Sequence, residues 1–338
     1  MSSISQPATF LELKTDLLNR MRESTVITAA PSTMAGRYIN MALHDLHLNP
    51  GGSTPNWPWA IRRAVLLTHA PYTTGTVSIT AAARTTVTGA STLWNTAVTG
   101  MGYNNVRVGG KIKFGNNEVY NVATVVSDTS LTLESRYTGD SAISAGSYTY
   151  LEDEYALATD FGKMVDARIF SFDYDMPLIG PMEFRRKYAR NDILGTPRMA
   201  TIIQLGFTAS VTPQYRVVLG PAPDRVYSVP YDYITTNLAV SAAGIEQGNL
   251  VEDTDEPILP IRYRHALILH AQETWYRDLK DDTRSQEVKA EYIDLVARIC
   301  NDFGIGQQNR PRIQPMRSNV GGYGGGRFDV NGRFDRMQ

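Results

Sequence analysis

Residues 118–126 read EVYNVATVV, and residues 130–135 read SLTLES after a short turn signal. Apolar and polar residues alternate in both runs, and this period of two is typical of a strand with one buried face. TVSIT at 76–80 and KIKF at 111–114 repeat the pattern. Because residues 75–150 are rich in Thr, Ser, Val and Gly and show no helical period, we expect a small all-β module there, a barrel or a sandwich.

Helical periods flank this module on both sides. Residues 9–23, TFLELKTDLLNRMRE, place apolar residues three and four apart, and Thr9 with Glu12 predicts a capping box. A second helix is expected from about Pro31, with one apolar stripe made of Met34, Tyr38, Ala42 and Leu46. After the module we expect a short charged helix in PMEFRRKYAR and two long helices between Pro260 and Phe303.

Several strand patterns lie outside the module, between these helices. They are the end of WPWAIRRAVLLTHAPY, then KMVDARIFSFDY, MATIIQLGF, QYRVVLG and RVYSVPYDYIT. We therefore predict an α+β fold, with a helical bundle core packed on a small mixed or antiparallel sheet. The predicted division is a helical and mixed core at 1–74 and 151–303, the inserted β module at 75–150, and an extended Gly/Arg-rich C-terminal arm at 304–338.

Charge and composition exclude several classes of protein. The chain carries 33 basic and 34 acidic residues, so its net charge of -1 gives no overall field that would hold nucleic acid by counterion release. No run approaches the roughly 18 apolar residues of a membrane span, and MSSISQPATF lacks the features of a signal peptide. The single cysteine, Cys300, excludes an internal disulfide and fits a buried apolar position on a helix.

The arm at 304–338 is locally cationic and repeats the tetrapeptide Gly-Arg-Phe-Asp. Its composition is too poor in apolar residues to fold alone, so either a partner orders it or it is a solvated tail. As a docking arm it would use its arginines to pair with carboxylates and its phenylalanines as apolar anchors. The residues that we assign to this role are Arg310, Arg312, Arg317, Tyr323, Arg327, Phe328, Arg333 and Phe334.

The motifs in the sequence argue against an enzyme. Val108–Lys111 lacks the first glycine of a phosphate loop and is followed by Ile112 where Ser or Thr would bind magnesium, so we interpret it as a turn into a strand. His44 and His47 could share a helix face, but no third ligand of suitable spacing follows. We expect no catalytic residue, no cofactor and no metal. A solvated loop also accounts for the acidic cluster Glu252, Asp253, Asp255 and Glu256.

The order of the pieces resembles the head-to-tail adaptor, or connector, proteins of tailed bacteriophages. The matching phrases cover nearly the whole chain up to about residue 303. They are FLELKTDLLNRM, RYINMALHDL followed by WPWA, GTVSIT, TTVTGASTLW, TSLTLESRYTGDS, EDEYALATDF, VVLGPAPDRVYSVPYDY, LPIRYRHALILHAQ and EYIDLVARI. The arm at 304–338 has no counterpart in this pattern.

The resemblance implies a structural virion protein with no active site, located at the head-tail junction and assembled in the host bacterial cytoplasm. It would form a homo-oligomeric ring, usually of twelve copies, that binds the portal and extends the channel for the genomic double-stranded DNA. The ring would also offer a platform for tail, nozzle or fibre proteins. In this frame we expect the module at 75–150 to contact the tail and the arm at 304–338 to contact the portal.

Two other functions remain open from the residues alone. The module could recognise a carbohydrate or a host surface, because it is rich in Thr and Ser and holds Trp94 in an expected loop where it could stack on a sugar. The arginine arm could instead bind nucleic acid, which predicts tight binding with a steep salt dependence. Glycan binding by the isolated module would favour the first, and loss of DNA binding on truncation the second.

Overall fold

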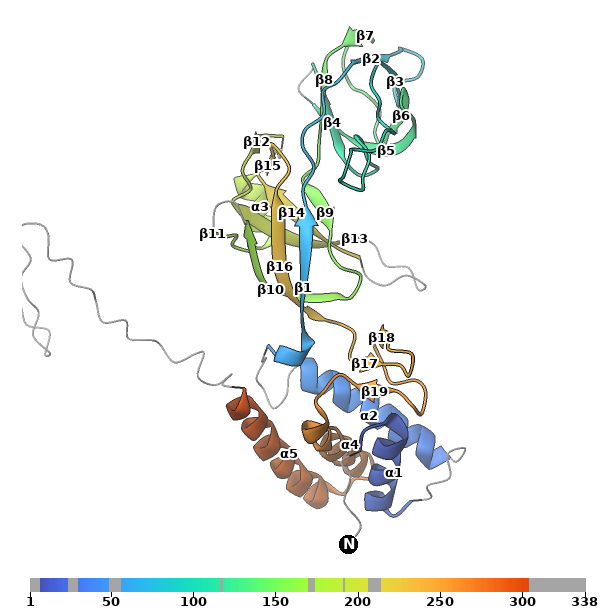
Figure 1. The fold of residues 1–338 in the computed structure, drawn as a ribbon, viewed down its shortest axis with the longest axis vertical. Coiled ribbons are helices and arrows are strands. Elements are labelled where there is room, and N and C mark those ends of the chain that lie inside the picture. Colours follow the sequence, from blue (N-terminus) through green and yellow to red (C-terminus); the bar gives the residue numbers. More distant parts are fainter. Residues whose placement is uncertain are drawn as a thin grey trace, which may run out of the picture.

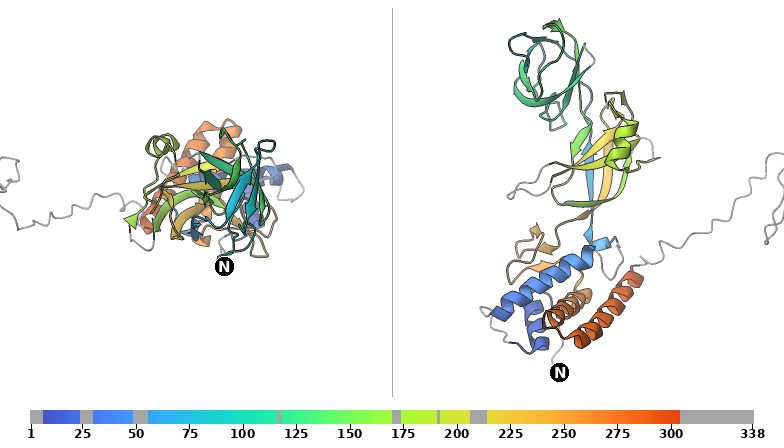
Figure 2. Two further views of the ribbon diagram at one scale, coloured as in Figure 1. Left: turned by 90° about the horizontal axis from the view of Figure 1, so that it is seen from above. Right: turned by 180° about the vertical axis from the view of Figure 1, so that it is seen from behind.

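The computed structural model describes residues 7–23, 30–48, 56–115, 118–169, 174–190, 192–205 and 214–303. Figure 1 shows three tiers along the long axis of the molecule: a helical tier, a middle tier of two sheets, and the β module at the opposite end. Figure 2 shows the same order from behind. Each tier has its own cluster of buried apolar side chains. The molecule is therefore long, and its two ends present separate surfaces.

The helical tier contains α1 (Phe10–Met21), α2 (Ala30–Leu48), α4 (His265–Asp278) and α5 (Asp282–Asp302). The predicted capping box is confirmed, because the Thr9 hydroxyl accepts from the Glu12 amide and the Glu12 carboxylate accepts from the Thr9 amide. On α2, Tyr38, Ala42 and Leu46 are buried as predicted, whereas Met34 is exposed. A small sheet of β17 (Ala239–Val240), β18 (Glu246–Gln247) and β19 (Glu256–Pro257) belongs to this tier (Figure 1).

The middle tier packs two sheets around a tyrosine-rich core. One sheet has the order β1 (Ile61–Leu67), β16 (Ser228–Thr235), β10 (Phe161–Ile169), β11 (Tyr174–Asp175). The other has the order β13 (Met199–Leu205), β14 (Gln214–Gly220), β9 (Glu154–Ala156). Tyr155, Tyr227, Tyr231 and Tyr233 are buried between them. The short helix α3 (Pro181–Lys187) and the pair β12 (Leu194–Gly195) and β15 (Ala222–Pro223) complete the tier.

The β module is one curled sheet of seven strands in the order β7-β2-β3-β6-β5-β4-β8. Strands β2, β4 and β6 alternate half-buried and buried residues, as the period of two predicts. Trp94 lies at the centre of the module core and is fully buried. The strands are β2 (Thr76–Ile79), β3 (Thr86–Ala90), β4 (Lys111–Phe114), β5 (Val119–Ser127), β6 (Ser130–Leu133), β7 (Ile143–Gly146) and β8 (Tyr148–Leu151).

The predicted fold class is wrong. Strands dominate the described chain. The four longest helices form one tier rather than a bundle core around a small sheet, and α3 lies in the middle tier. The error has a physical cause: some strands, such as β9 and β12, are two or three residues long and are held by partners far away in the sequence. Such strands leave no periodic signal. Among the described residues, no helix is long and apolar enough to cross a bilayer.

Candidate functional site

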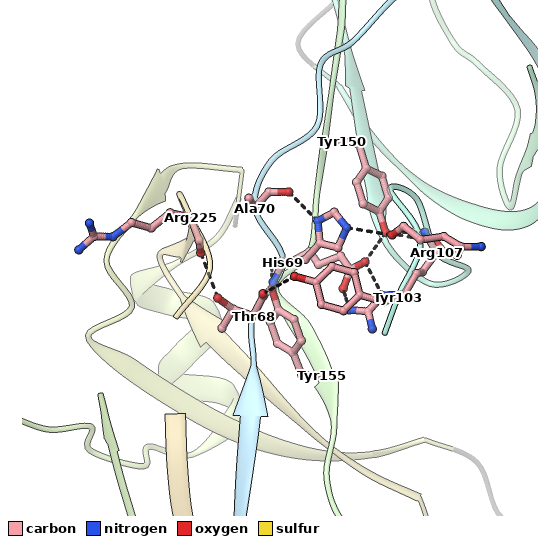
Figure 3. A network of polar contacts seen from close by, with 10 residues as sticks. Thr68, His69, Ala70, Tyr103, Arg107, Tyr150, Tyr155 and Arg225 are labelled. Atoms are coloured by element: carbon pink, nitrogen blue, oxygen red, sulfur yellow. Dashed lines mark hydrogen bonds and ion pairs between the residues drawn. The ribbon is translucent and has the colours of Figure 1, made fainter. Parts of the chain in front are cut away.

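Several buried polar side chains lie at the junction between the middle tier and the β module, namely Thr68, His69, Glu152 and Asp153. The chain crosses it twice, once after β1 and once after β8, and the two crossings are joined by mutual backbone hydrogen bonds of 2.8 and 2.9 Å between Tyr72 and Tyr150. Figure 3 shows the side chains that gather here from both crossings and from the loop before β4. This junction decides how the module is held.

His69 lies at the centre of the junction and is almost completely buried. Its backbone amide donates to the Tyr155 hydroxyl at 3.1 Å, and its ring nitrogens lie 2.5 Å from the Ala70 carbonyl oxygen and 3.1 Å from that of Asn104. The Tyr103 ring packs on the imidazole at 4.9 Å between centroids. One residue thus connects the middle tier, through Tyr155, to the module, through Tyr103 and Asn104 (Figure 3).

Arg107 and Glu152 form the ion pair that crosses the junction. Glu152 has a side chain only 4% exposed, and it accepts two bonds from the Arg107 guanidinium, of which that from Nε is 2.9 Å long. The Tyr150 hydroxyl also donates to Glu152, at 2.5 Å. Burial would lower the pKa of Arg107, but the hydrogen bond and negative charge of Glu152 outweigh it and raise that pKa. Arg107 is therefore a cation at the junction.

Two lysines of β4 form further bridges to the middle tier. Lys111 Nζ lies 2.6 Å from Oδ2 of Asp153, whose side chain is 2% exposed. Lys113 Nζ lies 2.9 Å from Oδ2 of Asp192, which also accepts from Arg190 at 2.8 Å. Burial raises the pKa of Asp192, but these two cations reverse the effect and lower it. Cations of the module thus meet carboxylates of the middle tier on both sides of the junction.

Cavities lie beside the junction among the described residues. One of about 210 Å³ lies between the end of β1 and β9, beside Arg107. A larger one, about 540 Å³, has Glu118 and Ser135 in its wall. Glu118 is already bonded by the hydroxyls of Tyr120 and Thr138, and no histidine lines this cavity to activate Ser135. Among the described residues, no group of three His, Cys, Asp or Glu could hold a metal ion.

Among the described residues, the fold does not bring the candidate site residues from the sequence into one site. All eight residues assigned to the docking arm, Arg310 to Phe334, lie outside the described residues. Val108–Lys111 is a turn into β4, as interpreted, with Gly109 in the left-handed region at φ +84°. His44 contacts the Asn249 side chain at 2.6 Å and His47 the Leu43 carbonyl oxygen at 2.7 Å, so the two imidazoles serve different contacts.

The acidic cluster is solvated only in part, because Glu252 and Glu256 are exposed whereas Asp255 is buried. Asp255 is 1% exposed, and its carboxylate accepts the backbone amides of Val251 and Glu252, each at 2.8 Å. Lys14 of α1 pairs with Asp253, and Arg264 pairs with Glu256 at 3.1 Å. The cluster therefore anchors α1 and the residue before α4 to the loop that carries it. The pattern of charges along the sequence could not show this, because Lys14 is far away in the chain.

Sequence reasoning missed the junction. His69 is a lone histidine whose partners lie as far as 35 and 86 residues along the chain. The available signal was the position of the module boundaries, since a histidine stands before the module and the acidic triplet Glu152, Asp153, Glu154 follows it. Residues at the two boundaries of an insertion must lie side by side. The sequence matches no family model, and no curated protein matches it.

Proposed function

We propose that the chain is a structural virion protein, a head-to-tail adaptor that forms a ring of twelve copies below the portal. One observation supports this role most directly: the module is fixed at the far end of a long molecule by buried ion pairs, Arg107 with Glu152 and Lys111 with Asp153. An adaptor must hold one partner in register with another, and a fixed module on a separate helical tier meets that need. The order of the phrases along the sequence, which resembles that of the head-to-tail adaptors, supports this family in particular.

The proposed partners divide along the long axis. The β module contacts tail, nozzle or fibre proteins, and residues 304–338, outside the described part of the chain, dock on the portal. Genomic DNA passes through the ring without sequence-specific contact. A net charge of -1 suits this passage, because a strongly basic lumen would retain DNA by counterion release. The location is the head-tail junction of the virion, after assembly in the bacterial cytoplasm.

Electron microscopy of the purified chain, alone and mixed with portal rings of the same virus, tests the proposal. We expect closed rings that stack coaxially on the portal. A chain that stays monomeric in both conditions would contradict the proposal. Truncation at residue 303 separates the two contacts, since we expect the truncated chain to keep its ring contacts and lose attachment to portal-bearing heads. Attachment that survives truncation would contradict the role of the arm.

The alternative of sugar binding through Trp94 finds no support in the fold. Trp94 is fully buried in the module core, and its indole nitrogen donates to the Tyr148 hydroxyl at 2.9 Å. Burial raises the pKa of Tyr148 to about 12, although the bond from Trp94 acts the other way. A ring enclosed in this way has no face free to stack on a sugar. Trp94 therefore serves the core of the module.

A further inference from the structure

The guanidinium of Arg216, on β14, lacks a partner within the described chain. Its Nε is buried without a hydrogen-bond acceptor, and no carboxylate of the described residues pairs with the guanidinium. A buried donor without an acceptor costs free energy, and in native proteins such a group usually has an acceptor from a water molecule, an ion or a ligand. Arg216 is therefore a cation whose counterpart the described residues do not supply.

Arg216 lines the cavity of about 210 Å³ at the junction. Its neighbour Val217 faces the tyrosine core, so the Arg216 side chain lies on the opposite, outer face of the sheet. There it stands opposite Ile203 of β13 and Ala156 of β9, which share this face. The middle tier thus presents the guanidinium between two apolar side chains, on the side where the module packs.

The module approaches Arg216 through Gly109, which lines the same cavity. A Cβ at position 109 would lie 3.3 Å from Nη1 and 3.9 Å from Nη2 of Arg216, so a larger residue would crowd the guanidinium. The φ of +84° at Gly109 is also one that residues with a side chain rarely adopt. The turn before β4 therefore leaves room for the guanidinium in the cavity wall.

The other charged side chains of the wall already have partners. Glu152 accepts two hydrogen bonds from Arg107, and Glu154 Oε1 lies 3.6 Å from Lys111 Nζ. Arg216 is the cation of the wall that pairs with no described carboxylate. Glu152 and Glu154 still oppose negative charge in the cavity, so a singly charged anion fits better than a multiply charged one such as phosphate.

The remaining side chains of the wall are apolar or aromatic, namely Leu66, Leu67, Val108, Tyr155 and Ala156. Ligand sites combine such walls with a few placed polar groups, and sites for drug-sized ligands have volumes of about 300–1,000 Å³. This cavity is smaller and suits a group of side-chain size. A guanidinium binds a carboxylate through two parallel hydrogen bonds, a match that few other anions share.

We propose that this cavity binds a carboxylate on a short apolar stem. The carboxylate oxygens accept from the Arg216 guanidinium, and the stem packs against Leu66, Leu67 and Ala156. Two sources supply such a group: a free short-chain carboxylic acid, and the Asp or Glu side chain of a protein that packs against the junction. The inference goes beyond the proposed adaptor role and does not depend on the ring.

Saturation-transfer NMR of the full chain with sodium propionate tests the site. We expect saturable binding that the neutral analogue propionamide does not show. Arg216→Gln should weaken it by at least about tenfold, because a charge-assisted pair is lost. Glu154→Gln should strengthen it by about twofold, because a negative charge leaves the wall. No saturable binding, equal binding by Arg216→Gln, or weaker binding by Glu154→Gln would overturn the inference.

Circular dichroism should show that both variants fold. If Arg216→Gln does not fold, Arg216→Lys replaces it, since lysine keeps the charge and loses the fork that binds both oxygens. Arg216→Lys should bind propionate several-fold more weakly than the wild type, and equal binding would overturn the inference.

A blocked tripeptide with a central glutamate, compared with its glutamine counterpart, separates the two sources. Binding of the glutamate peptide that depends on Arg216 supports the site and identifies a partner's side chain as the source. Binding of propionate without binding of this peptide supports the site and identifies a free carboxylic acid. Failure of both ligands to bind would overturn the inference and leave the proposed function standing.

Discussion

At the scale of single residues, Glu152 is the carboxylate on which the junction depends. It is buried and bonded by both Arg107 and Tyr150. We expect Glu152→Gln to lower the free energy of unfolding by about 1–2 kcal/mol. This loss is smaller than that for a fully buried ion pair, because the Arg107 side chain is partly exposed. Urea denaturation measures the loss. The matched control is Asp294→Asn in an exposed pair, which should change stability by less than about 0.5 kcal/mol. Equal losses would contradict the role given to Glu152.

The burial of His47 should make the stability of the helical tier depend on pH. Burial lowers its pKa to about 4, and the Trp59 indole donates to its Nε2 at 3.1 Å, which requires a neutral ring. Above pH 6.5 the unfolded chain also keeps this histidine neutral. Between pH 6.5 and 4 only the unfolded chain takes up the proton, so stability falls as pH falls through this window.

Thermal melts of the wild-type chain and of His47→Gln, at a series of pH values, measure this dependence. We expect the wild type to lose more stability than the variant between pH 6.5 and 4, because the glutamine takes up no proton. Parallel curves for the wild type and His47→Gln would contradict the assignment.

At the scale of elements, α1 depends on the loop that carries the acidic cluster. The Phe10 amide donates to the Asp255 carbonyl oxygen at 2.8 Å and the Leu11 amide to that of Asp253 at 3.0 Å. The loop is shaped by the Asp255 carboxylate, whose pKa falls because two backbone amides and Gln247 outweigh the effect of its burial. The first turn of the helix is therefore satisfied by a segment far away in the sequence.

We expect Asp255→Ala to leave the amides of Val251 and Glu252 without their acceptor and to cost about 1–3 kcal/mol. Hydrogen exchange of α1 should accelerate, while exchange of the module strands should stay unchanged. Thr9→Ala gives the comparison, since loss of one cap costs about 1 kcal/mol and leaves the loop intact. Accelerated exchange throughout the chain would contradict a local role for Asp255.

Elements were far easier to predict from the sequence than their assembly. The helix at 10–21 was predictable because Thr9, Glu12 and the apolar spacing act within one turn. The pairing of β1 with β16 joins Ile61 to Ile234, and no local pattern specifies a pairing over that distance. The same limit applies to the junction. Its ion pairs and the burial of His69 follow from tertiary contacts, so neither the fold class nor the site could be derived from periodicity.

At the scale of the whole molecule, the three tiers have separate cores, and the module enters and leaves through adjacent strands. Tyr72 and Tyr150 pair directly, so the chain can be closed below the module without moving the middle tier. The module core shares no residue with the other two clusters. Removal of the module should therefore disturb the rest of the fold at the junction contacts.

We therefore expect a chain in which two glycines replace residues 73–149 to fold and to keep its ring contacts, because the helical and middle tiers keep their own cores. Circular dichroism and sedimentation measure these two properties. The deletion removes Arg107 and Lys111, the cations that pair with Glu152 and Asp153, so Glu152→Gln and Asp153→Asn are introduced with it. If the module is the tail contact, portal-bearing heads should still bind this variant but should not acquire tails. Heads that acquire tails normally would show that the tail contact lies elsewhere on the adaptor.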